Sequence, residues 1–119
     1  MKSATLPEPR LTSDFQISAL KRLVEAGGGF ATVLRKGDRT SGAILLIGQI
    51  RGENPVLFER FPSLDGKSVW EPASAQIDDN ETEVDAYWQK RASSDPDLWV
   101  IELDVASPER LDGLLASNT

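Results

Sequence analysis

The stretch Ala43-Ile44-Leu45-Leu46-Ile47 constrains the fold more than any other part of the sequence. Side chains along a β-strand point alternately to the two faces of a sheet, and in this stretch both faces are apolar. A strand of this kind lies in the centre of a sheet with both of its sides covered. We therefore predict a central strand over residues 41–50 and a second buried strand, Leu98–Leu103.

Three segments are predicted to form helices. Polar and apolar residues recur at helical spacing in Asp14–Ala26, which indicates a helix with one buried face. Ser13 or Asp14 can act as its N-cap, because a side-chain oxygen there accepts a free backbone N–H. A second helix is expected over Glu81–Ser93, and Pro108 opens a short last helix, Pro108–Leu115.

The remaining predicted strands are rich in aromatic and β-branched residues and are separated by turns. They are Phe30–Lys36, Val56–Phe61 and a short one at Lys67–Glu71. The element order is then α-β-β-β-(β)-α-β-α. Short links between the early strands favour an antiparallel meander, whereas the last strand follows a helix and can join parallel to a neighbour. We predict the α+β class, with a single mainly antiparallel sheet of four or five strands and two main helices, on one face of the sheet.

The chain has 119 residues, a length that fits one domain. Residues 1–9 contain two prolines and no periodicity, so we expect a flexible N-terminal tail before a single α+β domain over residues 10–115. Residues 116–119 are expected to fray. No apolar run reaches the roughly 18 residues of a membrane span, and the first residues lack the apolar middle of a signal peptide. We expect a cytoplasmic protein.

The composition excludes several kinds of chemistry, because the chain has neither cysteine nor histidine. Without cysteine there are no disulfides, no thiol catalysis and no Cys-ligated metal clusters. Without histidine there is no Ser-His-Asp triad and no histidine zinc site. The sequence predicts no catalytic residue, no metal ligand and no cofactor, although oxygen ligands for a hard cation remain available.

The charge is unevenly distributed along the chain. The formal net charge is −6, while residues 1–72 carry 10 basic and 8 acidic groups and residues 73–119 carry 3 and 11. An acidic chain argues against nucleic acid as a partner, because nucleic-acid binders carry a basic field. The asymmetry lets the basic part pack on the acidic part, within one chain or across a homodimer. A free edge expected at Val56–Phe61 also favours a homodimer.

Four residues are candidates for binding a ligand. Arg35, Lys36 and Arg39 surround a tight turn at Gly37, which could hold an anion or an acidic partner. Glu59 lies on a later strand and could join them in one pocket. A pocket containing Arg35, Arg39 and Glu59 would favour a ligand-binding domain, whereas an Arg39 that points into solvent would favour an interaction module.

Two aromatic residues are candidates for a partner surface. Trp70 borders a proline and is expected to be partly exposed, and Tyr87 lies on the second predicted helix. Aromatic side chains of this kind are enriched in protein interfaces. Trp88 and Trp99 are expected in the core instead.

Several short motifs, taken together, resemble a known family. The resemblance rests on the order and spacing of the motifs Arg10-Leu11-Thr12-Ser13-Asp14, Ile17-Ser18-Ala19-Leu20, Gly28-Gly29-Phe30-Ala31, Arg35-Lys36-Gly37-Asp38, Ser41-Gly42-Ala43-Ile44-Leu45 and Asp95-Pro96-Asp97-Leu98-Trp99-Val100-Ile101-Glu102. Over residues 10–104 the chain resembles the small alphaproteobacterial family filed as domain of unknown function 1491. The resemblance implies a compact cytoplasmic bacterial protein of one domain, and it carries over no catalytic residue.

The functional prediction is a non-enzymatic interaction or accessory module with an unknown protein partner. It would work through a sheet edge or through the basic turn around Gly37. The alternative is a domain that binds an anion or a small molecule, including a carboxylate-based metal-dependent hydrolase that uses Arg35, Arg39 and Glu59.

Overall fold

The computed structural model describes residues 12–60, 70–72 and 81–117. Within these ranges the elements follow the predicted order, α-β-β-β-β-α-β-α. Their bounds are α1 (Ser13–Ala26), β1 (Phe30–Arg35), β2 (Ile44–Ile50), β3 (Glu53–Arg60), β4 (Trp70–Pro72), α2 (Glu81–Ser94), β5 (Trp99–Val105) and α3 (Pro108–Ser117). The α+β class is confirmed.

The strands form one sheet in the order β1-β5-β2-β3-β4. β5 pairs antiparallel with β1 and parallel with β2, and β2, β3 and β4 pair antiparallel in succession. The sheet is therefore mixed, and the prediction of a mainly antiparallel sheet is wrong in this respect. The cause is α2, which returns the chain so that β5 enters beside β2 in the same direction.

Two topological expectations change with this strand order. The predicted meander holds for β2, β3 and β4, but β1 is separated from β2 by β5. The segment expected to be a free edge lies in β3, which is enclosed by β2 and β4 over part of its length. Among the described strands the two edges of the sheet are β1 and β4.

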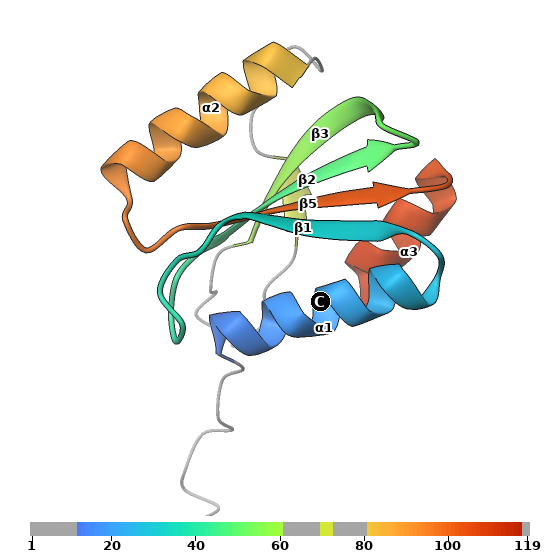
Figure 1. The fold of residues 1–119 in the computed structure, drawn as a ribbon, viewed down its shortest axis with the longest axis horizontal. Coiled ribbons are helices and arrows are strands. Elements are labelled where there is room, and N and C mark those ends of the chain that lie inside the picture. Colours follow the sequence, from blue (N-terminus) through green and yellow to red (C-terminus); the bar gives the residue numbers. More distant parts are fainter. Residues whose placement is uncertain (1–11, 61–69, 73–80, 118–119) are drawn as a thin grey trace, which may run out of the picture.

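The helices cover both faces of the sheet, so the expectation of helices on one face is wrong. Figure 1 shows α1 and α3 below the sheet and α2 above it. The reason lies in β2, where Ile44 and Leu46 pack toward α1 and α3 while Leu45 and Ile47 pack toward α2. An apolar strand of this kind needs cover on both sides.

The core on the α1 side is the larger of the two. Its fully or nearly fully buried members come from α1, β2, β4, β5 and α3 and are Ile17, Leu20, Val24, Ile44, Leu46, Trp70, Trp99, Ile101, Leu103, Val105 and Leu111. Gly48 allows the close approach of α3, because a Cβ there would lie 2.8 Å from the side chain of Leu111. The α2-side core holds Leu45, Ile47, Leu57, Val84, Leu98 and Val100.

The predicted element ends shift by a few residues. The N-cap of α1 is Thr12 and not Ser13 or Asp14, because the Ser13 hydroxyl donates to the Gly42 carbonyl over 2.6 Å in the interior. β3 begins at Glu53, directly after a tight turn in which Arg51 and Gly52 have φ values of 50° and 77°. Two positive φ values match the twist of a hairpin turn.

The remaining shifts are at strand and helix ends. β2 begins later than expected, at Ile44, while β5 continues to Val105 and α3 to Ser117. The predicted strand over residues 67–71 and the tail at residues 1–9 fall wholly or partly outside the described residues. In the described part of the chain, no helix has the length and apolar character needed to cross a membrane.

Candidate functional site

A polar cluster lies between α2 and the sheet. Glu59 projects from β3 and is buried, and Tyr87 and Arg91 project toward it from α2. The Tyr87 hydroxyl donates to Glu59 Oε1 over 3.3 Å, and Arg91 Nη1 donates to the Tyr87 oxygen over 3.3 Å. Arg91 and Glu59 also form an ion pair. The cluster thus satisfies a carboxylate that burial would otherwise disfavour.

The polar groups of this cluster are engaged by one another. Burial raises the pKa of the Tyr87 hydroxyl above its ordinary value, because the charged phenolate is disfavoured there. The Arg91 guanidinium lies 6.0 Å from the centre of the Tyr87 ring, within cation–π range. Tyr87 therefore uses its hydroxyl and its ring inside the chain, and it is only half-exposed.

Arg35 lies on the same face of the sheet as Glu59, but two strands lie between them. It pairs with Val100, Val100 with Leu45, and Leu45 with Glu59, so the four residues form one row across β1, β5, β2 and β3. At the usual strand spacing, the Cα atoms of Arg35 and Glu59 are about 14 Å apart. Arg35 Nη2 donates to the carbonyl of Pro96 over 3.2 Å.

The loop between β1 and β2 (residues 36–43) is held by an aspartate turn. Asp38 Oδ2 accepts the backbone N–H of Ser41 over 2.9 Å and of Thr40 over 3.1 Å, and the Ser41 hydroxyl over 3.2 Å. These donors hold the pKa of the Asp38 carboxyl below its ordinary value, the Ser41 N–H contributing most. The turn around Gly37 is therefore locally fixed.

The same loop is fastened to the start of β5. The Asp38 N–H donates to the Asp97 carbonyl over 3.0 Å, and the indole Nε1 of Trp99 donates to the Asp38 carbonyl over 2.6 Å. Gly37 and Gly42 both press on this segment, and a Cβ at either position would overlap the Asp97 carbonyl oxygen. Glycine is thus required by space at these two positions.

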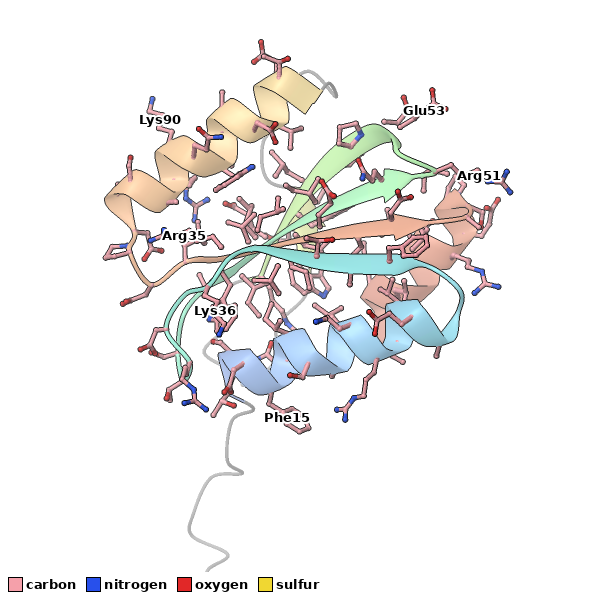
Figure 2. The ribbon with its side chains drawn as sticks, in the orientation of Figure 1. Phe15, Arg35, Lys36, Arg51, Glu53 and Lys90 are labelled. Atoms are coloured by element: carbon pink, nitrogen blue, oxygen red, sulfur yellow. The ribbon has the colours of Figure 1, made fainter. Side chains whose placement is uncertain are left out.

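Arg39 lies at the tip of the loop and points into solvent. Its side chain is 85% exposed and its Nε lies 3.2 Å from Asp14 Oδ2 at the start of α1. The Thr12 hydroxyl, and to a smaller extent Arg39, hold the pKa of Asp14 below its ordinary value. Lys36 is exposed beside Arg35 at the same end of the sheet, opposite to Arg51 and Glu53 (Figure 2).

Trp70 is not on the surface. Its exposed fraction is 9% and it belongs to the core beneath the sheet, so the expectation of a partly exposed ring is wrong. The guanidinium of Arg60 lies 5.3 Å from the ring centre. Burial lowers the pKa of Arg60 below its ordinary value, because the guanidinium is partly withdrawn from water.

A cavity of about 280 Å³ opens between the end of α1 and α3. Its walls are the side chains of Leu23, Val24, Val105 and Leu114, with glycine backbone between them. Arg110 Nη1 stands at this cavity and donates to the Gly27 carbonyl over 2.8 Å. That contact caps the C-terminal end of α1 and already engages the charge of Arg110.

One corner of the sheet on the α2 side is not covered by α2. Alternate residues of β5 belong to the α1-side core, so Val100, Glu102 and Asp104 face the α2 side. Their partners on β1 place Thr32 beside Glu102 and Phe30 beside Asp104. The α2-side core ends at Val100, and Phe30 is 72% exposed. We call Phe30, Thr32, Glu102 and Asp104 the open corner.

The sequence does not single out the residues of the open corner. Phe30 looks like an ordinary strand residue, and its exposure follows only from where α2 lies. Arg91 gave a clearer signal, because an arginine on the apolar stripe of a helix indicates a buried acidic partner. Of the candidate residues, the structure joins Tyr87 to Glu59 and leaves Arg39 at a distant loop tip. Within residues 12–60, 70–72 and 81–117, no cluster of acidic side chains is placed to hold a metal ion.

The family model described as "Protein of unknown function (DUF1491)" matches residues 11–112. The chain belongs to the DUF1491 family. The matched range contains all five described strands, α1 and α2 in full and the first half of α3, and the resemblance noted in the sequence motifs is confirmed. No curated protein matches the chain.

Solved structures share the fold, and two of the three described next are labelled DUF1491 family proteins. A crystal structure from Caulobacter crescentus CB15 is 39% identical, with 79% of this chain and 87% of that chain covered and a TM-score of 0.71. An NMR structure of a family protein from the same bacterium is 36% identical, covers 82% and 88%, and has a TM-score of 0.72. The solution structure of protein Atu0922 from A. tumefaciens is 28% identical, covers 86% and 92%, and has a TM-score of 0.68.

Proposed function

We propose that the protein is a non-enzymatic interaction module that binds a protein partner through β1 and the open corner. The observation that carries the proposal is the exposure of Phe30, whose side chain is 72% accessible on an edge strand. Among the described strands, β1 pairs only with β5, so half of its backbone groups face outward. An extended segment of a partner can pair with such an edge while the aromatic ring supplies apolar contact area.

The positions of the candidate ligand residues support this function over the alternative. Arg39 points into solvent at the loop tip, and Glu59 is engaged by Arg91 and Tyr87 beneath α2. Arg35 is separated from Glu59 by two strands. The three side chains needed for a ligand pocket therefore lie at three different places. We further propose a cytoplasmic location, which the composition permits because a chain without cysteine has no disulfide that needs an oxidising compartment.

The binding surface can be tested by site-specific photo-cross-linking in cells. A benzophenone side chain replaces Phe30 in one sample and Phe15 in the other; Phe15 is also exposed but points away from the sheet beneath α1 (Figure 2). We expect a discrete cross-linked species from position 30, and none from position 15. The partner that cross-links to position 30 is then purified. The affinity of this protein for that partner should fall about tenfold with Phe30→Ala. Equal cross-linking from both positions would contradict the proposal.

The absence of catalysis can be tested separately. We expect no hydrolytic turnover of phosphoester or nucleic-acid substrates with Mg²⁺ or Mn²⁺. Turnover that disappears in Glu59→Gln, with the circular dichroism spectrum unchanged, would overturn the proposed function. Glu53→Gln, which removes an exposed carboxylate from the same strand, is the matched control.

A further inference from the structure

Glycines leave space between the C-terminal end of α1 and α3. Figure 1 shows α3 against this part of α1, beneath the sheet. Gly27, Gly29 and Gly113 line the cavity of about 280 Å³ there, and a Cβ at Gly113 would meet nothing within 4 Å. Glycine inside a helix is less favourable than alanine, so α3 keeps this space open although a side chain there would stabilise the helix.

The walls of the cavity are apolar. Leu23 and Val24 come from α1, Val105 from the end of β5 and Leu114 from α3. Leu23 lies at the rim, because its side chain is 43% exposed, whereas Val24 is buried. Apolar surface of this kind favours contact with an apolar group over contact with water. The walls therefore suit a hydrocarbon chain.

Arg110 supplies the polar part of the cavity lining. Among the described residues that line the cavity, it has the one polar side chain. Its Nη1 donates to the Gly27 carbonyl over 2.8 Å, which engages the charge without neutralising it, because the carbonyl has no formal charge. Within the described ranges Arg110 forms no ion pair, and its side chain makes no other hydrogen bond. The remaining N–H groups of the guanidinium match the planar geometry of a carboxylate.

We propose that the cavity binds a small carboxylate with an apolar chain, its chain between Leu23, Val105 and Leu114 and its carboxylate on Arg110. At roughly 30 Å³ for each water-sized group, the cavity holds on the order of nine non-hydrogen atoms. This size corresponds to a chain of about eight carbon atoms with the carboxylate at the rim. The inference goes beyond the proposed function, because the cavity lies beneath the sheet and the open corner lies on its α2 side.

The lining disfavours other kinds of occupant. A peptide segment would bring backbone N–H and C=O groups into the cavity. The N–H groups of Gly27 and Gly29 already donate to the Val24 carbonyl, so the C=O groups of such a segment would find few donors, which is unfavourable. An amine would meet the like charge of Arg110. One apolar chain with one anionic group is the ligand whose parts the lining can pair.

Titration of the protein with sodium octanoate tests the inference. The amide NMR signals of Gly27, Gly29 and Gly113 should shift, with a dissociation constant on the order of 100 µM. From butanoate to octanoate the affinity should rise about threefold for each added methylene, because each buries more apolar surface. Octylamine has the same chain and the opposite charge at pH 7, and it should not bind measurably.

Two variants separate the roles of the chain and the charged group. Arg110→Gln keeps an N–H for the Gly27 carbonyl but removes the charge, so octanoate should bind about fivefold more weakly while 1-octanol is unaffected. Gly113→Leu fills the cavity with the side chain of a better helix former, so both ligands should bind at least about tenfold more weakly. Arg22→Gln and Asp112→Leu are the matched controls, because both positions are exposed and neither lines the cavity. Both should change the affinity less than twofold.

The inference fails if the glycine signals do not shift up to about 5 mM octanoate. Octanoate that binds no more tightly than octylamine, or that binds Arg110→Gln as well as the wild type, would overturn the role of Arg110. Unchanged binding to Gly113→Leu would overturn the cavity as the site. Each of these results leaves the proposed function untouched, because cross-linking at position 30 probes the other side of the sheet.

Discussion

Glu59 is a carboxylate that the sheet places where water cannot solvate it fully. Its exposed fraction is 8%, and Arg91 and Tyr87 reach it from α2 with an ion pair and a hydrogen bond. An ion pair of this kind is costly to break from one side, because the remaining charge is left buried without a partner. The cluster therefore fixes how α2 sits on the sheet.

Removing Arg91 alone should destabilise the fold. We expect Arg91→Leu to lower the free energy of unfolding by about 2 kcal/mol, less than for a fully buried pair because its side chain is 27% exposed. Urea denaturation followed by tryptophan fluorescence measures this change. Lys90→Leu, on the exposed side of the same helix, should change stability by less than about 0.5 kcal/mol.

The double variant Glu59→Leu, Arg91→Leu gives the second arm of that experiment. With both charges removed, no unpaired charge remains buried, so we expect it to be more stable than Arg91→Leu alone. The single variant Glu59→Leu is measured as well. If the loss of unfolding free energy in the double variant equals the sum of the losses in Glu59→Leu and Arg91→Leu, the two side chains do not act as a pair.

Asp38 predicts a dependence of stability on pH. Its pKa in the folded protein lies below the ordinary value of 3.8, so its contribution is fully present above about pH 4. The contribution is lost as the pH falls through the lowered pKa and the carboxyl takes up a proton. Asp38→Ala should therefore reduce the melting temperature at pH 6, and the difference from the wild type should shrink toward pH 2.

The exposed Asp112 on α3 offers the matched control for this titration. Asp112→Ala also removes one carboxylate, but not one that accepts the backbone N–H groups of a turn as Asp38 does. Measured over the same pH range, this variant is the reference for the loss of one exposed carboxylate. A constant difference for Asp38→Ala would show that the turn does not depend on the charge.

At the scale of elements, the β1–β2 loop is held against β5 by glycine. A Cβ at Gly42 would overlap the Asp97 carbonyl, which is backbone and cannot rotate away. We expect Gly42→Ala to cost about 2 kcal/mol, as for other overpacked interior sites. Differential scanning calorimetry of the purified variant measures the loss.

For Gly113 we expect the opposite effect of a glycine-to-alanine substitution, a gain in stability. It lies inside α3, and a Cβ there would meet nothing within 4 Å. Gly113→Ala should stabilise the protein by about 0.5–1 kcal/mol, because glycine is a poor helix former. A destabilised variant would show that α3 is held in a shape that alanine cannot adopt.

The elements themselves could be predicted from the sequence, because each depends on local patterns. The apolar run in β2, the amphipathic pattern of α1 and the proline that opens α3 all act within a few residues. The strand order could not be predicted in the same way. Nothing local in β1 or β2 indicates that β5, some fifty residues later, separates them. The exposure of Phe30 depends on the same long-range arrangement.

The candidate site was predictable only in part. The sequence indicates Glu59 as a ligand residue and Tyr87 as part of a partner surface. Their contact with each other could not be predicted, because it depends on the register of β3 beneath α2. Arg35 and Arg39 are four residues apart and yet point to different surroundings, since the loop turns sharply at Asp38. Trp70 looked exposed beside a proline, whereas β4 places it over the core.

For the whole molecule, β5 is the strand on which the sheet depends. It pairs with both β1 and β2, and it supplies Trp99, Ile101 and Leu103 to the larger core. A chain that ends at residue 97 should therefore remain unfolded, with little dispersion in its amide NMR spectrum. A chain that lacks only residues 118 and 119 is the control and should fold. A folded 1–97 fragment would show that β1 and β2 can pair without β5.

Because β5 follows the other described strands in the chain, a ribosome must deliver the segment up to Val105 before the sheet can close. Until then β1 and β2 emerge with no central strand between them, and their apolar faces are open to the surrounding medium. Closure of the sheet during synthesis is thereby postponed until β5 has emerged. Chaperone demand and aggregation at high expression should respond to the time that passes between the synthesis of β2 and that of β5 more than to any earlier stage.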